Sequence, residues 1–195
     1  MQNPNIKYEE VKQAASEFLK KYHSKQLPVP IEDIVEQQMK IAIVVVPGIK
    51  SFLGVDAFIS SAFDQITVDA HCFSRFPERT RFSIAHEIGH LILHKNLYEQ
   101  YGPKNIEDYM VFHDKIDDEV YKFIEIQAQT FAGLVLVPTE SLLDELKKRL
   151  GRVPSLESVE ILAPFIQDLP ELFQVSDAVI LKRLQREKLV KPLTY

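Results

Sequence analysis

The sequence is poor in cysteine and tryptophan, and it contains no long apolar run. Cys72 is the one cysteine among 195 residues, so no intrachain disulfide can form, which favours a reducing compartment. No segment approaches the roughly 18 consecutive apolar residues of a membrane span, and the first residues lack the basic and apolar regions of a secretory leader. We therefore expect a cytoplasmic protein that does not engage a membrane.

An excess of cations is also absent. The chain holds 23 lysines and arginines against 28 aspartates and glutamates, which gives a net charge of −5. Because nonspecific binding to nucleic acid depends on neutralising phosphates, direct binding to nucleic acid is not expected of the whole chain. Hydrophobic residues make up 46% of the sequence, enough for a real core, and this excludes disorder as the main state.

Apolar residues recur mostly at the spacing of helices, and three short runs have the pattern of strands. The β-branched run IAIVVV over 41–46 predicts a buried strand, and 55–60 and 65–68 predict two more. The expected fold class is α+β: mainly helical, with an antiparallel sheet of about three strands packed against a buried helix and the C-terminal helices. The buried helix spans 80–97; further helices are predicted over 8–22, 31–38, 117–137, 141–150, 159–165, 170–173 and 177–186, with an exposed acidic connection over 103–114.

The middle of the predicted helix 80–97 carries a metal-binding pattern. Its sequence is FSIAHEIGHLIL, in which Glu87 is the one residue with a certain charge. Residues four apart lie on one face of a helix, so His86 and His90 can offer two imidazole nitrogens to one metal ion. This H-E-x-x-H spacing suits a tetrahedral zinc ion, and Glu87 lies beside that face, where it can hold a water molecule without binding the ion.

The alternative interpretation is a chance match on a core helix. An ionised Glu87 in such a helix would cost several kcal/mol unless a polar or cationic group compensated it. Zinc and its water would supply that compensation, so the pattern favours a metal site.

A catalytic zinc needs a third protein ligand, and the residues just after the motif do not provide it. The extension H-E-x-x-H-x-x-G-x-x-H would need glycine and histidine where the chain has Leu93 and Asn96. His94 follows His86 by two further turns, about 12 Å along a helix axis, so one ion cannot comfortably bind both. We expect His94 behind the ligands or as a polar residue near the helix end.

Glu125, on the predicted helix 117–137, is the favoured third ligand. Small residues follow it on the same face at Ala128 and Ala132, and small side chains allow helices to pack closely. Gly89, inside the motif, offers the matching narrow point on the other helix, so Glu125 can approach the two histidines. The alternatives left open are Asp118, Glu119 and His113.

Other residues could support the same site. Asp118, two turns before Glu125, could accept the far N–H of a ligating histidine, and a capping role explains it equally well. A hydrogen-bond donor to a tetrahedral oxyanion is also needed, and the sequence does not choose among Tyr121, Tyr109 and His113. An inhibitory thiolate at Cys72 is less favoured than an ordinary, half-buried cysteine.

Two blocks of sequence, RFSIAHEIGHLILH over 81–94 and EIQAQTFAGLVLVP over 125–138, resemble the ImmA/IrrE family of zinc metallopeptidases. Weaker matches at LPVPIEDI and FQVSDAVILKRL extend the similarity over most of residues 8–190. The resemblance implies a small sheet packed on helices and a thermolysin-like active-site helix. It also implies one zinc ion held in a gluzincin-like site by His86, His90 and Glu125, with Glu87 as the catalytic acid/base.

The resemblance further implies a protein substrate. Members of this family typically cleave a helix-turn-helix repressor and so release genes of mobile elements, phages or the damage response. Two departures limit the transfer: Gln129 stands where asparagine is expected, and no room exists before Tyr8 for the N-terminal DNA-binding domain of some relatives. The repressor is therefore an inference from the family alone.

Two other functions compete with a zinc endopeptidase. Residues 169–191 resemble a helix-turn-helix whose end is locally basic, which is typical of a DNA-binding regulator, although nearby acidic residues weaken the field. The other is a partner-binding protein with a zinc site but no proteolysis, yet structural zinc sites usually have four protein ligands and only three are evident here.

We therefore predict a zinc endopeptidase that occupies residues 1–195 as a single domain. Its catalytic core is expected over 8–140, and a helical, helix-turn-helix-like appendage over 141–195. Glu87 would take a proton from the zinc-bound water and pass it to the leaving amine, while an exposed strand edge within 55–68 binds the substrate.

Overall fold

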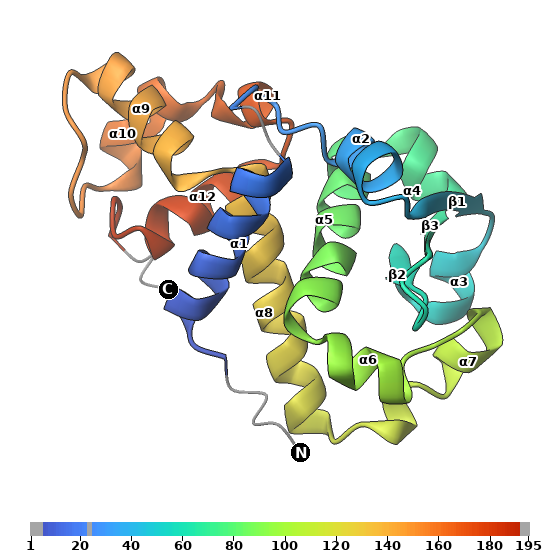
Figure 1. Ribbon diagram of the computed structural model, residues 1–195. Coiled ribbons are helices and arrows are strands. Elements are labelled where there is room, and N and C mark those ends of the chain that lie inside the picture. Colours follow the sequence, from blue (N-terminus) through green and yellow to red (C-terminus); the bar gives the residue numbers. More distant parts are fainter. Residues whose placement is uncertain (1–5, 23–24, 192–195) are drawn as a thin grey trace.

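The computed structural model describes residues 6–22 and 25–191, apart from the side chain of His113. The fold is α+β and mainly helical, as predicted. A three-stranded sheet lies on one side of the central helices α5 and α8, and α1 and the C-terminal helices lie on the other (Figure 1). The elements are α1 (Tyr8–Tyr22), α2 (Ile31–Asp33), η1 (Ile34–Gln38), β1 (Ala42–Val46), α3 (Ile49–Leu53), β2 (Ala57–Ile59), β3 (Gln65–Asp69), α4 (Ala70–Arg75), α5 (Pro77–Leu93), α6 (Lys95–Tyr101), α7 (Ile106–Met110), η2 (His113–Lys115), α8 (Asp118–Leu136), α9 (Thr139–Leu150), α10 (Val159–Ile166), α11 (Leu169–Phe173) and α12 (Asp177–Arg186).

The sheet is mixed, which departs from the purely antiparallel arrangement predicted. Its strand order is β1-β3-β2: Val44 of β1 lies opposite Thr67 of β3 in a parallel pair, and Phe58 of β2 lies opposite Thr67 in an antiparallel pair. The difference arises because α3 carries the chain away from β1, so β3 returns between the two earlier strands. Gly48 and Gly54 flank α3 with φ of 83° and 76°, in the left-handed region that favours glycine.

The central helices α5 and α8 approach each other closely at Gly89. A Cβ atom on this residue would lie 3.0 Å from the Cα and 3.1 Å from the carbonyl oxygen of Ala128, so glycine is required here. The close approach predicted from these two small residues is confirmed. Ile84 and Ile88 of α5 are fully buried, as expected of a helix that is apolar on nearly all sides.

The helix predicted over 80–97 is divided in two. Helix α5 ends at Leu93, His94 adopts φ −124° and ψ 22°, and α6 begins at Lys95. The segment predicted as an exposed connection is also partly internal, because it contains α7 and buries Tyr109 and Phe112. The acidic residues around these two aromatics made the whole segment look exposed.

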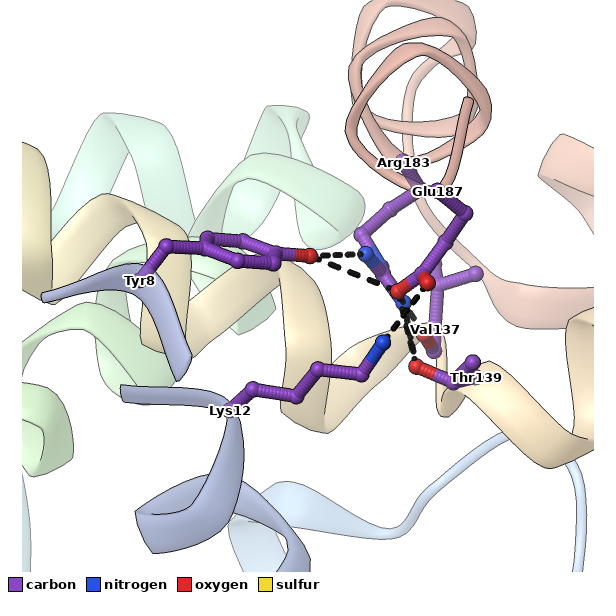
Figure 2. Close-up of polar contacts among 6 residues, drawn as sticks. All are labelled: Tyr8, Lys12, Val137, Thr139, Arg183 and Glu187. Carbon is purple, nitrogen blue, oxygen red and sulfur yellow. Dashed lines mark hydrogen bonds and ion pairs between the residues drawn. The ribbon is translucent and has the colours of Figure 1, made fainter. Parts of the chain in front are cut away.

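A buried network of polar side chains joins α12 to α1 and to the end of α8 (Figure 2). Arg183 donates from Nε to the carbonyl oxygen of Val137, and from Nη2 to the Thr139 hydroxyl and the Glu187 carboxylate. Glu187 also accepts a hydrogen bond from Nζ of Lys12 at 2.7 Å. The side chain of Arg183 is only 4% exposed, so it is an internal residue and not part of a basic surface.

Among the described residues, no single helix has both the length and the apolar composition needed to cross a membrane. Helices α8 and α9, which meet at 51°, satisfy that test of length and composition only when taken together.

Candidate metal centre

Three side chains from α5 and α8 converge on one point. His86 and His90 lie one turn apart on α5, and their Nε2 atoms are 3.0 Å apart. Glu125 of α8 reaches both rings: its Oε2 is 3.2 Å from Nε2 of His86, and its Oε1 is 3.2 Å from Nε2 of His90. The close approach at Gly89 permits this meeting, because a side chain there would push α8 away from α5.

The three groups fit a divalent metal ion such as zinc. Zinc binds histidine nitrogen and carboxylate oxygen at about 2.0–2.2 Å, so two ligand atoms of a tetrahedral site lie roughly 3.3 Å apart. The separations of 3.0 and 3.2 Å between the donor atoms are close to that value. Two imidazoles and one carboxylate also form a ligand set that leaves a fourth position open for water or substrate.

The protonation states of two of the three groups agree with this fit. Burial acts to raise the pKa of Glu125, but hydrogen bonds with His86 and His90 outweigh it and hold that pKa well below its usual range. Burial lowers the pKa of His90 to about 4, so this ring is neutral near pH 7. Burial also opposes charge on His86, yet its hydrogen bond with Glu125 raises its pKa. A carboxylate and a neutral ring are thus ready to donate electron pairs.

Glu87 lies beside these groups and is 6% exposed. One donor atom from each of His86, Glu87 and His90 lies within 4.8 Å of the others. Oε2 of Glu87 accepts a hydrogen bond from the backbone N–H of Ile59 in β2 at 2.9 Å. Burial raises the pKa of Glu87 to about 8, with His86 opposing the shift and Glu125 adding to it. Because Glu125 contacts both rings and Glu87 is held by β2, Glu125 is the better placed third ligand.

His94 contacts the other nitrogen of the His90 ring. The two Nδ1 atoms are 3.1 Å apart, and Nε2 of His94 is 2.8 Å from Oε1 of Gln127. Burial is the main cause that lowers the pKa of His94 to about 3, and the nearby His90 adds to the shift. The residue therefore lies behind the ligands, where it was expected. Gln127 was missed, because a glutamine on a mostly apolar helix gives no sign of the side chain it faces.

A cleft of about 270 Å³ opens onto the convergent groups. Tyr98 and Tyr109 line it and are buried, and burial raises the pKa of both hydroxyls, so both keep their protons at neutral pH. Tyr121 is hydrogen-bonded to Tyr109 and to Glu125. Of the two predicted oxyanion donors whose side chains the structure describes, Tyr109 and Tyr121, Tyr109 is the one that lines the cleft. Tyr98 was missed, because it reaches the cleft only through the bend at His94.

The remaining predicted residues lie elsewhere. Asp118 and Glu119 are exposed in the first turn of α8, and the position expected for Asp118, next to a ligating histidine, is filled by His94. The side chain of His113 lies outside the described residues. Cys72 is buried, with the Thr80 hydroxyl 3.6 Å from its Sγ, and it does not line the cleft, which excludes an inhibitory thiolate in this structure.

An H-E-x-x-H helix packed against a second helix that delivers a carboxylate is the arrangement of a metallopeptidase. The family model for the IrrE N-terminal-like domain, Peptidase_M78, matches residues 74–185, which contain both helices. This match spans more than half of the chain, and the chain belongs to that family of metallopeptidases. The family resemblance found in the sequence is confirmed. No curated protein matches the chain.

Proposed function

We propose that this metallopeptidase is a zinc-dependent endopeptidase in which Glu87 is the general base and then the general acid. The observation that carries the proposal is the meeting of His86, His90 and Glu125 at one point, with Glu87 beside them and a cleft in front. When bound, zinc supplies a Lewis acid that polarises the scissile carbonyl and acidifies a water molecule.

The protein's own side chains have separate roles in this proposal. His86, His90 and Glu125 hold the ion. Glu87, whose raised pKa would fall once a cation lies beside it, accepts a proton from the attacking water and delivers it to the leaving amine as the C–N bond breaks. Tyr109, which lines the cleft, donates a hydrogen bond to the carbonyl oxygen as negative charge develops on it.

Strand β2 is the proposed binding edge for the substrate backbone. It is the last strand in the order β1-β3-β2, and Ala57 lines the cleft. Alternate residues of an antiparallel edge strand direct their N–H and C=O groups away from the partner strand, and Ile59 does so toward Glu87. Ala57 shares that orientation with Ile59, so an extended substrate can pair with its backbone and pass in front of Glu87.

A helix-turn-helix repressor in the cytoplasm is the substrate that the family resemblance favours. Pairing with an edge strand requires an extended segment, so we place the scissile bond in a linker and not within a helix of that repressor. The single cysteine supports a reducing compartment.

Metal content is the measurement that tests the site. The wild-type protein, Glu125→Ala and Glu119→Ala are purified without added metal and equilibrated with one equivalent of zinc, then subjected to elemental analysis. We expect about one zinc in the wild type and in Glu119→Ala, whose glutamate is exposed on the same helix, and loss of zinc from Glu125→Ala. Absence of zinc from all three proteins, or its retention by Glu125→Ala, would overturn the proposed ligand set.

A DNA-binding function is less favoured than proteolysis. Arg183 of the helix-turn-helix-like segment is internal and bonded to Glu187, which removes one cation from the basic surface proposed for α12. Salt-dependent binding to duplex DNA would revive this function.

A further inference from the structure

A second and larger cleft adjoins the metal centre, and the proposed catalytic steps do not use it. Its volume is about 980 Å³, against about 270 Å³ for the cleft in front of the ligands. It lies between the beginning of α5, the middle of α8 and helix α12. The two clefts share Arg79, Phe82 and Gln129 as lining residues, so together they form one continuous depression.

The lining of the larger cleft is apolar with a cationic rim. Phe82, Leu134 and Val179 contribute apolar surface from three different helices. Phe76 is 49% exposed and Ile126 is 43% exposed, so two large apolar side chains at this site remain in contact with solvent. Apolar surface left open in this way is typical of a binding groove.

The charges at the rim have one predominant sign. Lys182 and Arg186 of α12 are exposed, and neither forms a salt bridge with another described residue. Arg79 adds a third cation, partly balanced by its ion pair with Asp56 at 2.5 Å. Glu78 is the one carboxylate among the described residues that line the cleft. A positive rim of this kind stands out on a chain whose net charge is −5.

We propose that the larger cleft binds an acidic, amphipathic segment of the protein substrate, next to the segment that is cut. This inference rests on the proposed endopeptidase function. Apolar side chains of the segment would pack on the lining of α5, α8 and α12, and its carboxylates would face Lys182 and Arg186. A cleft of about 270 Å³ has room for only a short stretch of substrate. The larger cleft would therefore supply side-chain recognition, which backbone pairing with the edge strand does not.

The test measures binding to the metal-free protein, so that it does not depend on catalysis. The probe is a fluorescein-labelled peptide of about 18 residues, with leucine at helical spacings of three and four and glutamate elsewhere. Fluorescence anisotropy should show binding of this peptide and not of its counterpart with lysine in place of glutamate. Lys182→Glu/Arg186→Glu should weaken binding at least about tenfold. Lys20→Glu/Lys147→Glu, which makes the same charge change at exposed positions elsewhere, should not.

Several outcomes would overturn the proposal. They are no binding of the acidic peptide, equal binding of both peptides, or an equal loss in the two double variants. Binding of duplex DNA that depends on Lys182 and Arg186 would assign the rim to nucleic acid, and self-association through the cleft would assign it to a second copy of the chain. A negative result here leaves zinc binding and Glu87 catalysis untouched, and failure of zinc binding leaves the peptide result untouched.

Discussion

The C-terminal end of helix α8 joins a first buried polar cluster, around Glu187, and the middle of the helix contributes to a second of opposite character, around Glu125. The cluster around Glu187 contains its own cations: Lys12 and Arg183 hold the pKa of this carboxyl below its usual range, although burial acts against them (Figure 2). Among the described residues, no lysine or arginine forms a salt bridge with Glu87 or Glu125. The first cluster is complete when the chain folds and fastens α12 in place. The second gathers ligands without a counter-charge, which prepares it for an ion from solution.

The largest effect is expected at Glu87 in the second cluster, where one substitution should slow catalysis and leave metal binding intact. Glu87→Gln should lower the single-turnover cleavage rate by about 10²–10⁴, because the general base is lost. Zinc content and the midpoint of unfolding should stay at the wild-type values, since the amide fills the same space. Cleavage at the normal rate by the variant would contradict the role of Glu87.

The matching change in the first cluster should affect stability and not metal. Arg183→Met leaves Glu187 buried without its main partner, so the free energy of unfolding in urea should fall by about 3–5 kcal/mol. The exposed neighbour substitution Lys182→Met should change it by less than about 0.5 kcal/mol. Zinc bound by the folded protein should be unchanged, and a variant as stable as the wild type would refute the structural role.

Gly89→Ala tests whether helix spacing controls the ligands. The new methyl group would meet the backbone of Ala128 at about 3.0 Å, so α5 and α8 must move apart and Glu125 must withdraw from the histidines. We expect a loss of about 1–3 kcal/mol from the close contact, offset in part by the gain of about 1 kcal/mol in helix propensity. Zinc affinity measured by chelator competition should fall as well. Gly133→Ala, whose methyl group would meet only the Arg183 side chain at 3.4 Å, should leave that affinity unchanged.

The smallest effect is expected at Asp69, a buried carboxylate that belongs to neither cluster. This buried carboxylate accepts hydrogen bonds from the backbone N–H groups of Lys50, His71 and Cys72, so backbone donors complete it without a cation. Burial opposes ionisation, but these donors lower its pKa, and its contribution is therefore present above the ordinary aspartate pKa of about 3.9 and lost as pH falls toward the lower folded value. Asp69→Asn should cost about 1 kcal/mol at pH 7. The difference from the wild type should shrink in urea titrations below pH 4, and a difference independent of pH would contradict this account.

The parts of the molecule that the sequence predicted depend on local spacing. The histidines lie four residues apart on one helix, and the small residues Gly89 and Ala128 indicated where a second helix could approach, which brought Glu125 to the site. The helices themselves followed from apolar residues at intervals of three and four. The boundary predicted at residue 140, which separates the core from the C-terminal helices, stays a prediction.

The parts that sequence analysis missed depend on contacts between distant segments. The order of β1 and β3 is fixed by where α3 directs the chain, and the bend at His94 brings Tyr98 to the cleft. The basic end of residues 169–191 was taken as a surface because charge suggests exposure, yet Arg183 within it is buried by contacts with Val137 and Thr139, which lie far earlier in the chain. Gln127 contacts His94 only because α8 packs against α5. None of these pairings leaves a periodic pattern that residue types alone reveal.

The hydrogen bond between Ile59 and Glu87 has a consequence for where a substrate is cut. It holds Glu87, the proposed acid/base, at one defined position on the β2 edge, 2.9 Å from the backbone nitrogen of Ile59. A peptide that pairs with that edge would therefore lie in a fixed register relative to Glu87. If substrates bind to β2 as proposed, the cleavage point would be set by its distance from the docked part of the substrate more than by the identity of the residues at the bond.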